Sequence, residues 1–227
     1  MLPRTLEPEV MDSVEEASDY DRMDHSGVNR AFVEEFLTAW NQGRDNLSDA
    51  HLIDVGTGTA QIPVELARRD TGCRVVAVDL AGEMLKLARS NIAEARAGQF
   101  VEVELVDAKS LPHADGQFDG VISNSIIHHI AEPGVVFREM LRVLKPGGLL
   151  FVRDLMRPDD GATVDRLVET YAGDESRHAQ KLFHQSLHAA LTLSETQQMV
   201  VACGGDARWV HASSDRHWTI CGRRPNR

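Results

Sequence analysis

The segment from His51 to Ala60, with the sequence HLIDVGTGTA, constrains the fold of this chain more than any other segment. Residues suited to a buried strand lead directly into Gly56 and Gly58, and glycine lets the backbone turn sharply and approach a ligand closely. Asp54 lies inside the apolar run, where a carboxylate is costly unless a partner binds it. The pattern predicts a buried strand that feeds a ligand-binding turn.

Short apolar strands alternate with amphipathic segments along the chain. Helices are predicted at 28–41, from about 63 to 69, at 81–97 and at 133–144. Strands are predicted at 51–55, 74–78, 100–106, 118–123 and 149–152. Lys145-Pro146-Gly147-Gly148 is a strong helix breaker, so the last of these strands is expected to begin after it. The alternation predicts an α/β fold with a doubly wound, mostly parallel sheet whose ligands bind at the carboxyl ends of the strands.

The C-terminal third departs from this alternation. Residues 157–192 are expected to form two polar helices, roughly 162–172 and 175–190, which we interpret as a helical cap inserted after the fifth strand. Ser194 is the expected cap of a helix over 194–203. The last two strands, 207–212 and 217–221, are joined by few residues and must therefore pair antiparallel, which makes seven strands in all.

The N-terminal residues 1–27 are acidic, and residues 28–227 are expected to form a single domain. Tyr20, Met23, His25 and Asn29 place an aromatic ring, a thioether, an imidazole and an amide just before a helix, a composition that suits a pocket lid. A plain solvated arm accounts for the same composition equally well. Both interpretations of this arm stay open.

Charge and composition limit the partners. The net charge of −11 disfavours nucleic acid, and Arg223 and Arg224 are interpreted as a charged tail. Three scattered cysteines indicate neither a disulfide framework nor a zinc site, and no segment is typical of a signal peptide or a membrane span. We expect a cytoplasmic protein without a metal, a membrane or a nucleic acid as partner; the oligomeric state is left open.

Polar residues follow successive strands of the predicted sheet at the edge where its ligands should bind. They are Asp54 with its glycine turn, Asp79, Asp107, Asn124, Arg153 and Asp154. Asp79 lies roughly 20 residues after the glycine turn, the position of carboxylates that hold ribose hydroxyls in nucleotide-binding α/β proteins. Asp79 is equally placed to cap the next helix. We favour ribose because of the turn that precedes it.

In this order and spacing the motifs resemble those of the class I S-adenosylmethionine-dependent methyltransferases, in particular their small-molecule branch, over roughly residues 28–223. The resemblance implies a Rossmann-like seven-stranded sheet with a terminal antiparallel strand, an N-terminal helical lid and S-adenosylmethionine as cofactor. It implies that the cofactor is bound by Tyr20, Asp54, Gly56, Thr57, Gly58, Asp79, Leu80, Met84, Asp107, Ala108, Asn124 and Ser125. In this reading Asp54 organises the ammonium end and Asp79 the ribose, while Asn124 begins the motif NSIIHHI beside the methyl group. The sequence LKPGG at 144–148 is similar to the family's lead into strand five.

The implied activity is methyl transfer to a small-molecule acceptor by in-line displacement in a capped pocket. His25, His128 and His129 are candidate catalytic bases, although the last two also suit a structural role. Asn29 and Arg153 are candidate acceptor-binding residues. A guanidinium at the end of a core strand needs an anion, which is either a nearby acid such as Asp154 or an anionic acceptor.

Two other functions are compatible with parts of the pattern. A non-catalytic or non-methylating protein could bind the same cofactor. An NAD-dependent oxidoreductase would need a third glycine at position 61, where the chain has Gln61. His184 and His188 are spaced for a metal on one helix face, but no third ligand is evident, and we interpret them as ordinary cap residues.

Overall fold

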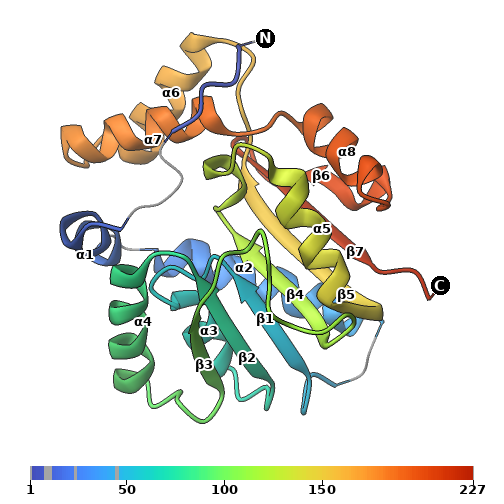
Figure 1. Ribbon diagram of the computed structural model, residues 1–227. Helices are drawn as coiled ribbons and strands as arrows, with labels where there is room; N and C mark the ends of the chain where they lie inside the picture. The colour runs from blue at the N-terminus through green and yellow to red at the C-terminus, as the bar shows by residue number, and fades with distance from the viewer. Residues whose placement is uncertain (1, 8–11, 23–24, 44–45, 227) are drawn as a thin grey trace. The chain divides into compact units, whose positions relative to one another are not determined.

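A seven-stranded sheet with the order β3-β2-β1-β4-β5-β7-β6 organises the chain in a computed structural model, which describes residues 2–7, 12–22, 25–43 and 46–226 (Figure 1). The strands are β1 (His51–Val55), β2 (Arg74–Asp79), β3 (Val101–Leu105), β4 (Phe118–Asn124), β5 (Leu144–Leu155), β6 (Val210–Ala212) and β7 (His217–Arg223). β1 pairs in parallel with β2 and β4, β2 pairs in parallel with β3, and β6 is antiparallel to β7. The predicted fold class is confirmed.

The helices lie close to their predicted ranges where the apolar pattern of the sequence is strongly periodic. They are α1 (Val14–Arg22), α2 (Ser26–Asn41), α3 (Gln61–Ala67), α4 (Gly82–Glu94), α5 (Pro133–Val143), α6 (Gly161–Ala172), α7 (Arg177–Ala189) and α8 (Leu193–Ala202), with the short 3₁₀ helices η1 (Ile127–His129) and η2 (Ala207–Trp209). The sequence did not predict α1, because four of its nine residues are acidic and its apolar face is narrow.

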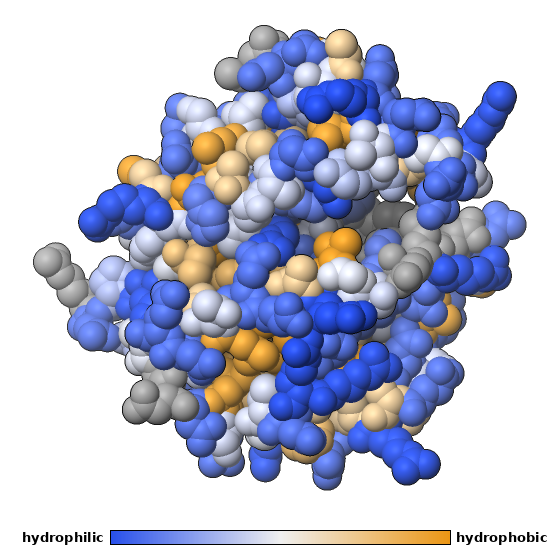
Figure 2. Space-filling model, turned by 180° about the vertical axis from the view of Figure 1, so that it is seen from behind, coloured by the Kyte–Doolittle hydropathy of each residue, from blue (hydrophilic) through white to orange (hydrophobic). Residues whose placement is uncertain are grey.

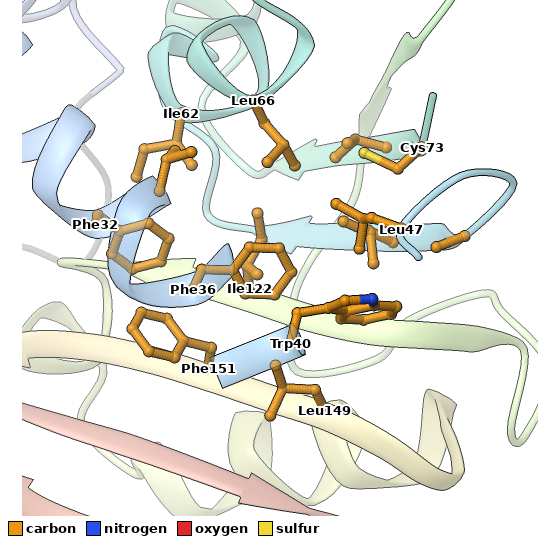
Figure 3. Close-up of a cluster of buried hydrophobic side chains, with 14 residues drawn as sticks. Phe32, Phe36, Trp40, Leu47, Ile62, Leu66, Cys73, Ile122, Leu149 and Phe151 are labelled. Carbon is orange, nitrogen blue, oxygen red and sulfur yellow. The ribbon is translucent and has the colours of Figure 1, made fainter. Parts of the chain in front are cut away.

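The main core fixes β1, the strand that leads into the glycine turn. Phe32, Phe36 and Trp40 of α2 are almost fully buried against side chains of α3 and the sheet (Figure 3). The rings of Phe32 and Phe151 meet edge to face with their centroids 5.0 Å apart, a favourable aromatic geometry. This packing holds the strand rigidly, so the turn that follows it has a fixed starting point.

The helix before Lys145–Gly148 ends as predicted, since α5 stops at Val143, but the predicted start of the next strand after Gly148 is wrong, because β5 already begins at Leu144. Gly147 donates its N–H to the Arg224 carbonyl, and Arg224 donates its N–H to the Gly148 carbonyl. Gly147 has a φ of 74°, which an L-residue rarely adopts. The two glycines therefore continue β5 by pairing with residue 224. Local propensity does not reveal this long-range contact.

Arg223 and Arg224 also have a different role from the charged tail that the sequence predicted. Arg223 donates from Nη2 to the Trp40 carbonyl at 3.0 Å and from Nη1 to the Gly147 carbonyl at 3.2 Å. Arg224 donates from Nη1 to the carbonyls of Arg142 and Leu144. Both guanidiniums thus satisfy backbone carbonyls at the ends of α2 and α5.

The chain divides into two compact units. The strand-rich unit contains the described residues of 10–124, together with 138–152 and 221–226, and the helical unit contains 2–7, 125–137 and 153–220. The predicted arm is shared between them, since residues 2–7 and 12–22 belong to different units. The division of the whole chain into an arm, one domain and a cap insertion at about 157–192 stays a prediction.

Helix α8 begins one residue earlier than predicted, and its cap is Thr192 rather than Ser194. The Glu195 N–H donates to Thr192 Oγ1 at 3.2 Å, and the Thr192 N–H donates to Glu195 Oε2 at 2.8 Å. This reciprocal pair is a capping box. The motif TLSE contains two possible capping residues, and the glutamate three positions after Thr192 decides between them.

We expect Thr192→Ala to lower the free energy of unfolding by about 1 kcal/mol, because an orphan N–H of the first turn loses its acceptor. Ser194→Ala is the matched control and should change it by less than about 0.5 kcal/mol. Urea denaturation of both variants measures the difference. Equal losses for the two would contradict the capping role of Thr192.

Hydrophilic residues cover most of the face shown in Figure 2, and apolar residues appear there in several separate areas. Across the described residues, no helix combines the length and the apolar character required to span a bilayer.

Candidate functional site

The turn after β1 is folded back onto β2 by its own backbone. Gly56 and Thr57 both donate their N–H groups to the Val78 carbonyl at 2.9 Å. Gly56 and Gly58 have φ values of 73° and 55°, so a side chain at either position would be strained. Ala60, at the start of α3, is also left-handed with a φ of 58°. The sequence prediction of a glycine-dependent turn is confirmed.

Asp54 is the buried carboxylate that the sequence left without an assigned partner. It is 2% exposed, and Thr57 Oγ1 donates to its Oδ2 at 2.6 Å. Burial raises the pKa of Asp54 to about 7, although the hydrogen bond from Thr57 opposes the shift. The charge of Asp79 raises this pKa further. A cation bound beside Asp54 would offset the cost of its charge.

Asp79 connects the end of β2 to both the glycine turn and α4. Its Oδ2 accepts the Gly58 N–H at 2.7 Å, and its Oδ1 accepts the Ala81 N–H at 2.9 Å. Burial raises the pKa of Asp79, and these backbone hydrogen bonds oppose the shift. The alternative that Asp79 supports the start of α4 is therefore present in the structure. Each carboxylate oxygen keeps acceptor capacity for a second donor.

Exposed apolar side chains lie next to Asp79. In the register of β2 and β3, Asp79 is opposite Leu105, and Leu105 is 63% exposed. Leu80 is 40% exposed, whereas Met84 is buried against Ala17 and Ala81. Two exposed leucines thus lie at the ends of adjacent strands, and exposed apolar side chains suit contact with a flat ring.

The remaining residues of the predicted cofactor site occupy neighbouring strand ends. Asp107 is partly exposed and accepts the Lys109 N–H at Oδ1 over 2.9 Å, and Ala108 is partly exposed beside it. Asn124 ends β4, two residues beyond Ile122, which is opposite Asp54 in the register. The parallel register therefore brings the ends of β1 to β4 to one edge, as the sequence predicted.

A network of amides and one carboxylate ties α1 and α2 to the glycine-turn helix. Asn29 Nδ2 donates to Gln61 Oε1 at 2.9 Å, and Gln61 Nε2 donates to Asp21 Oδ1 at 3.3 Å. Asn91 Nδ2 donates to the same Asp21 oxygen at 2.9 Å and to the Thr59 carbonyl at 3.0 Å. Sequence reasoning missed Asp21 and Asn91, and it treated Gln61 only as an absent glycine.

The predicted lid and base residues have separate environments. His25 precedes α2 and is partly buried. Asn29 is 9% exposed and holds Gln61, so its predicted acceptor contact stays a prediction. Tyr20 is part of α1, but its side chain lies outside the described residues. Ser125 has a φ of 61° and donates its N–H to the Arg153 carbonyl within the helical unit.

Arg153 and Asp154, which the sequence considered as a pair, have other hydrogen-bond partners. Arg153 is buried and donates from Nε to Thr219 Oγ1 at 3.0 Å. Asp154 is 0% exposed and its Oδ1 lies 2.5 Å from His128 Nδ1. Asp154 Oδ2 accepts the N–H groups of Ile127 at 2.5 Å and His128 at 3.2 Å. The acceptor role of Arg153 stays a prediction.

His128 is held between two carboxylates. Its Nε2 lies 3.4 Å from Glu7 Oε1, opposite the contact of Nδ1 with Asp154. Burial lowers the pKa of His128, but Asp154 and Glu7 more than compensate and raise it. Burial alone would raise the pKa of Asp154, and His128 holds it below its ordinary value. Both ring nitrogens thus have protein partners, which favours the structural alternative for His128.

Comparisons with known proteins find a related domain and a shared fold. Residues 53–152 match the family described as Methyltransferase domain. A S-adenosylmethionine-dependent methyltransferase from Aquifex aeolicus has the same fold, with a TM-score of 0.64 at 18% identity over 92% of this chain and 97% of that chain. Residues 53–152 are thus similar to a methyltransferase domain, and the chain shares its fold with the Aquifex aeolicus protein. The family match begins in β1 and ends in β5, so it contains the glycine turn and the strand ends described above.

Curated relatives of this chain differ in the atom that they methylate. The ubiquinone/menaquinone biosynthesis C-methyltransferase of Geotalea daltonii is 27% identical over 111 residues, which are 48% of this chain and 47% of that protein. The ubiquinone biosynthesis O-methyltransferase of Xanthomonas oryzae is 34% identical over 114 residues, which are 50% of this chain and 46% of that protein. The chain spans about half the length of both relatives.

Proposed function

We propose that this protein transfers a methyl group from S-adenosylmethionine to a small-molecule acceptor. The observation that carries the proposal is Asp54, a buried carboxylate with a pKa near 7 beside a glycine turn. Burying a charged carboxylate without a partner costs free energy, and a bound ammonium group would stabilise its charged form. The family match over β1 to β5 supports the same cofactor.

The strand ends offer a complementary partner for each part of the cofactor. Asp54 binds the ammonium end, and the left-handed glycine turn lets the backbone approach the methionine part. Asp79 accepts hydrogen bonds from the ribose hydroxyls, while Leu80 and Leu105 cover the adenine ring. Asp107 with Ala108, Met84, Thr57, Asn124, Ser125 and Tyr20 complete the proposed set.

Methyl transfer needs precise positioning more than it needs reactive side chains. The cofactor supplies an electrophilic methyl group on a sulfonium. The protein must hold the acceptor's lone pair in line with that methyl group and exclude water. A base is required only where the acceptor's own pKa lies well above the working pH, and His25, His128 and His129 are the proposed candidates.

The acceptor is proposed only as a class. The two relatives act in quinone biosynthesis at carbon and at oxygen, so they support a small molecule without fixing the atom. Asn29 and the buried guanidinium of Arg153 are proposed to contact it, the latter where the acceptor is anionic. The net charge of −11 and the free cysteines support a non-nucleic-acid partner and a reducing, cytoplasmic compartment.

Two measurements test this function separately. Calorimetry with S-adenosylmethionine and with its demethylated product tests the cofactor site. Incubation with methyl-labelled cofactor and pools of small metabolites, followed by separation of labelled products, tests transfer. Cofactor binding without any labelled product would favour a non-methylating binder, and absence of binding would overturn the proposal.

We expect the affinity for S-adenosylmethionine to rise about fivefold between pH 6 and pH 7. With a pKa of about 7, Asp54 is about one-tenth ionised at pH 6 and half ionised at pH 7, and apparent affinity scales with the fraction of the binding-competent form. Calorimetry at the two pH values measures the change. Asp54→Asn should bind more weakly and lose this pH dependence; a variant that retains it would assign the titration to another group.

The same titration affects stability in the absence of the cofactor. The folded-state pKa of Asp54 is raised above its unfolded value near 4, so the protonated form stabilises the fold. That contribution is fully present below about pH 4 and is lost as the pH rises through about 7. Bound cofactor should therefore oppose a loss of stability that the free protein shows toward neutral pH.

A further inference from the structure

Glu7 lies against the two adjacent histidines of η1 in the helical unit. Its Oε1 is 3.4 Å from His128 Nε2 and 3.2 Å from His129 Nδ1. The three candidate ligand atoms all lie within 4.8 Å of one another. The side chains of Glu7 and His128 are only 9% and 4% exposed. Three groups with lone pairs thus converge in a largely buried place.

These separations match the ligand spacing of a small divalent metal site. With metal–ligand bonds of about 2.0–2.1 Å, neighbouring ligand atoms of a tetrahedral zinc ion are about 3.3 Å apart. Two of the separations in the cluster are 3.2 and 3.4 Å. Two imidazoles and one carboxylate favour Zn²⁺ and similar transition metals over Mg²⁺ or Ca²⁺, which prefer oxygen ligands.

Further hydrogen bonds orient two of the three groups. His128 Nδ1 contacts Asp154 Oδ1 at 2.5 Å, so Nε2 is directed at Glu7. Metal-bound histidines usually have such a carboxylate on the other ring nitrogen, because it fixes the tautomer and orientation. Ser186 Oγ donates to the Glu7 carboxylate at 3.1 and 3.2 Å from its two oxygens.

The backbone near Glu7 is also held in place before any ion binds. Arg4 donates to the carbonyls of Ile127, His128, Ile130, Ala131 and Ala189. The Thr5 N–H donates to the His188 carbonyl at 3.1 Å. Residues 2–7 are therefore fixed to η1 and α7 by several long-range hydrogen bonds, which presents Glu7 to the histidines.

A half-open cavity of about 300 Å³ adjoins Glu7. Its lining residues are Thr5, Leu6, Glu7, His184, Gln185 and His188. Of the three candidate ligands, Glu7 lines the cavity whereas His128 and His129 do not, so the cavity borders the cluster only on the side of the carboxylate.

We propose that Glu7, His128 and His129 form a binding site for a divalent transition-metal ion of the Zn²⁺ class, with Asp154 as the positioning residue of His128. The sequence predicted no metal because Glu7 is about 120 residues away from the histidines and no ligand spacing relates them. A metal held by His128 and His129 would leave neither of them available as a base for methyl transfer, whereas the test of metal binding does not require that activity.

A proton is the competing occupant of the cluster. A doubly protonated His128 could donate to Asp154 and Glu7 at once, which would also account for the two short contacts. In that case the cluster binds no metal at neutral pH. A metal-binding experiment therefore distinguishes the two occupants directly.

The test uses the full chain without a purification tag, freed of metal by chelation. Titration with Co²⁺ should give visible absorption of a low-coordinate site, saturating at one equivalent, and Zn²⁺ should displace the signal. Glu7→Gln and His129→Gln should each bind Co²⁺ at least about 100-fold more weakly, because losing a ligand costs more than losing an outer-shell partner. The exposed residue His178 supplies the control, and His178→Gln should bind like the wild type.

Three results would overturn the site. Wild-type protein that takes up neither Co²⁺ nor Zn²⁺ at micromolar concentration would contradict the metal site and favour a proton as the occupant of the cluster. Unchanged binding by both Glu7→Gln and His129→Gln places the metal elsewhere. Loss of metal binding in His188→Gln, with binding retained in Glu7→Gln, would assign the metal to the neighbouring pair His184 and His188. Circular dichroism of each variant ensures that folded protein is compared.

Discussion

Asp154→Ala should lower the free energy of unfolding by about 3–5 kcal/mol, the range for breaking a buried, hydrogen-bonded ion pair. The Asp154 carboxylate accepts the N–H groups of Ile127 and His128 and contacts His128 Nδ1. Alanine leaves all these groups buried without their acceptor, and it leaves the raised-pKa imidazole without its main counter-charge. Urea denaturation measures the loss, provided that the free energy of unfolding falls with urea concentration at the same slope in the variant and in the wild type.

The matched control for this result is Asp165→Ala. Asp165 also faces a histidine, since His184 Nε2 is 3.8 Å from its Oδ1, but its side chain is 78% exposed. An exposed pair contributes little, so the change should stay within about 0.5 kcal/mol. Asp154→Asn separates charge from hydrogen bonding, because its amide oxygen can still accept backbone N–H groups. A loss below about 1 kcal/mol for Asp154→Ala would contradict the structural role assigned to it.

Asp79→Asn should weaken binding of S-adenosylmethionine and of its demethylated product about 10- to 100-fold. Hydrogen bonds to a charged acceptor contribute about 1.5–3 kcal/mol, and each 1.4 kcal/mol is a factor of ten in affinity. Asparagine keeps one acceptor oxygen for the N–H groups of Gly58 or Ala81, so the turn should survive. Calorimetry with both ligands measures the change.

Asp70→Asn is the control for the loss of one negative charge. Asp70 is exposed after α3 and has a φ of 49°, a conformation that asparagine tolerates well. The affinity of the Asp70→Asn variant for the cofactor should equal that of the wild type. Unchanged affinity in Asp79→Asn, with an unchanged melting temperature, would mean that Asp79 serves only to hold the turn and the start of α4.

The sequence predicted the strand-end residues well because their placement follows from local pattern and parallel topology. The glycine turn after His51–Val55 and the carboxylate at the end of β2 are short-range signals, and a parallel sheet must bring them to one edge. The register of β1 to β4 then fixes which side chains are neighbours. No long-range knowledge was needed for these assignments.

Other features depended on contacts between distant residues, which one sequence does not reveal. Glu7 and His128 are paired across about 120 residues, and Asp21 meets Asn91 across 70. The extension of β5 through Gly147 and Gly148 depends on Arg224, so local breaker propensity was overridden by a pairing partner. Thr192 and Ser194 were both possible caps, and only the geometry of Glu195 distinguished them.

The pairing of Gly147 and Gly148 with Arg224 has a consequence for the order in which the chain acquires its structure during synthesis. Helix α2 and strands β1 to β4 are available early, and β1 can pair with β2 and β4 as soon as these emerge. The Trp40 carbonyl accepts the Gly43 N–H and also a hydrogen bond from Arg223, which is made more than 180 residues later. A growing chain therefore exposes the end of α2 and the edge of β5 until nearly all the described sequence is made. Nascent chains stalled before β7 should be far more sensitive to proteases around Trp40 than the released protein.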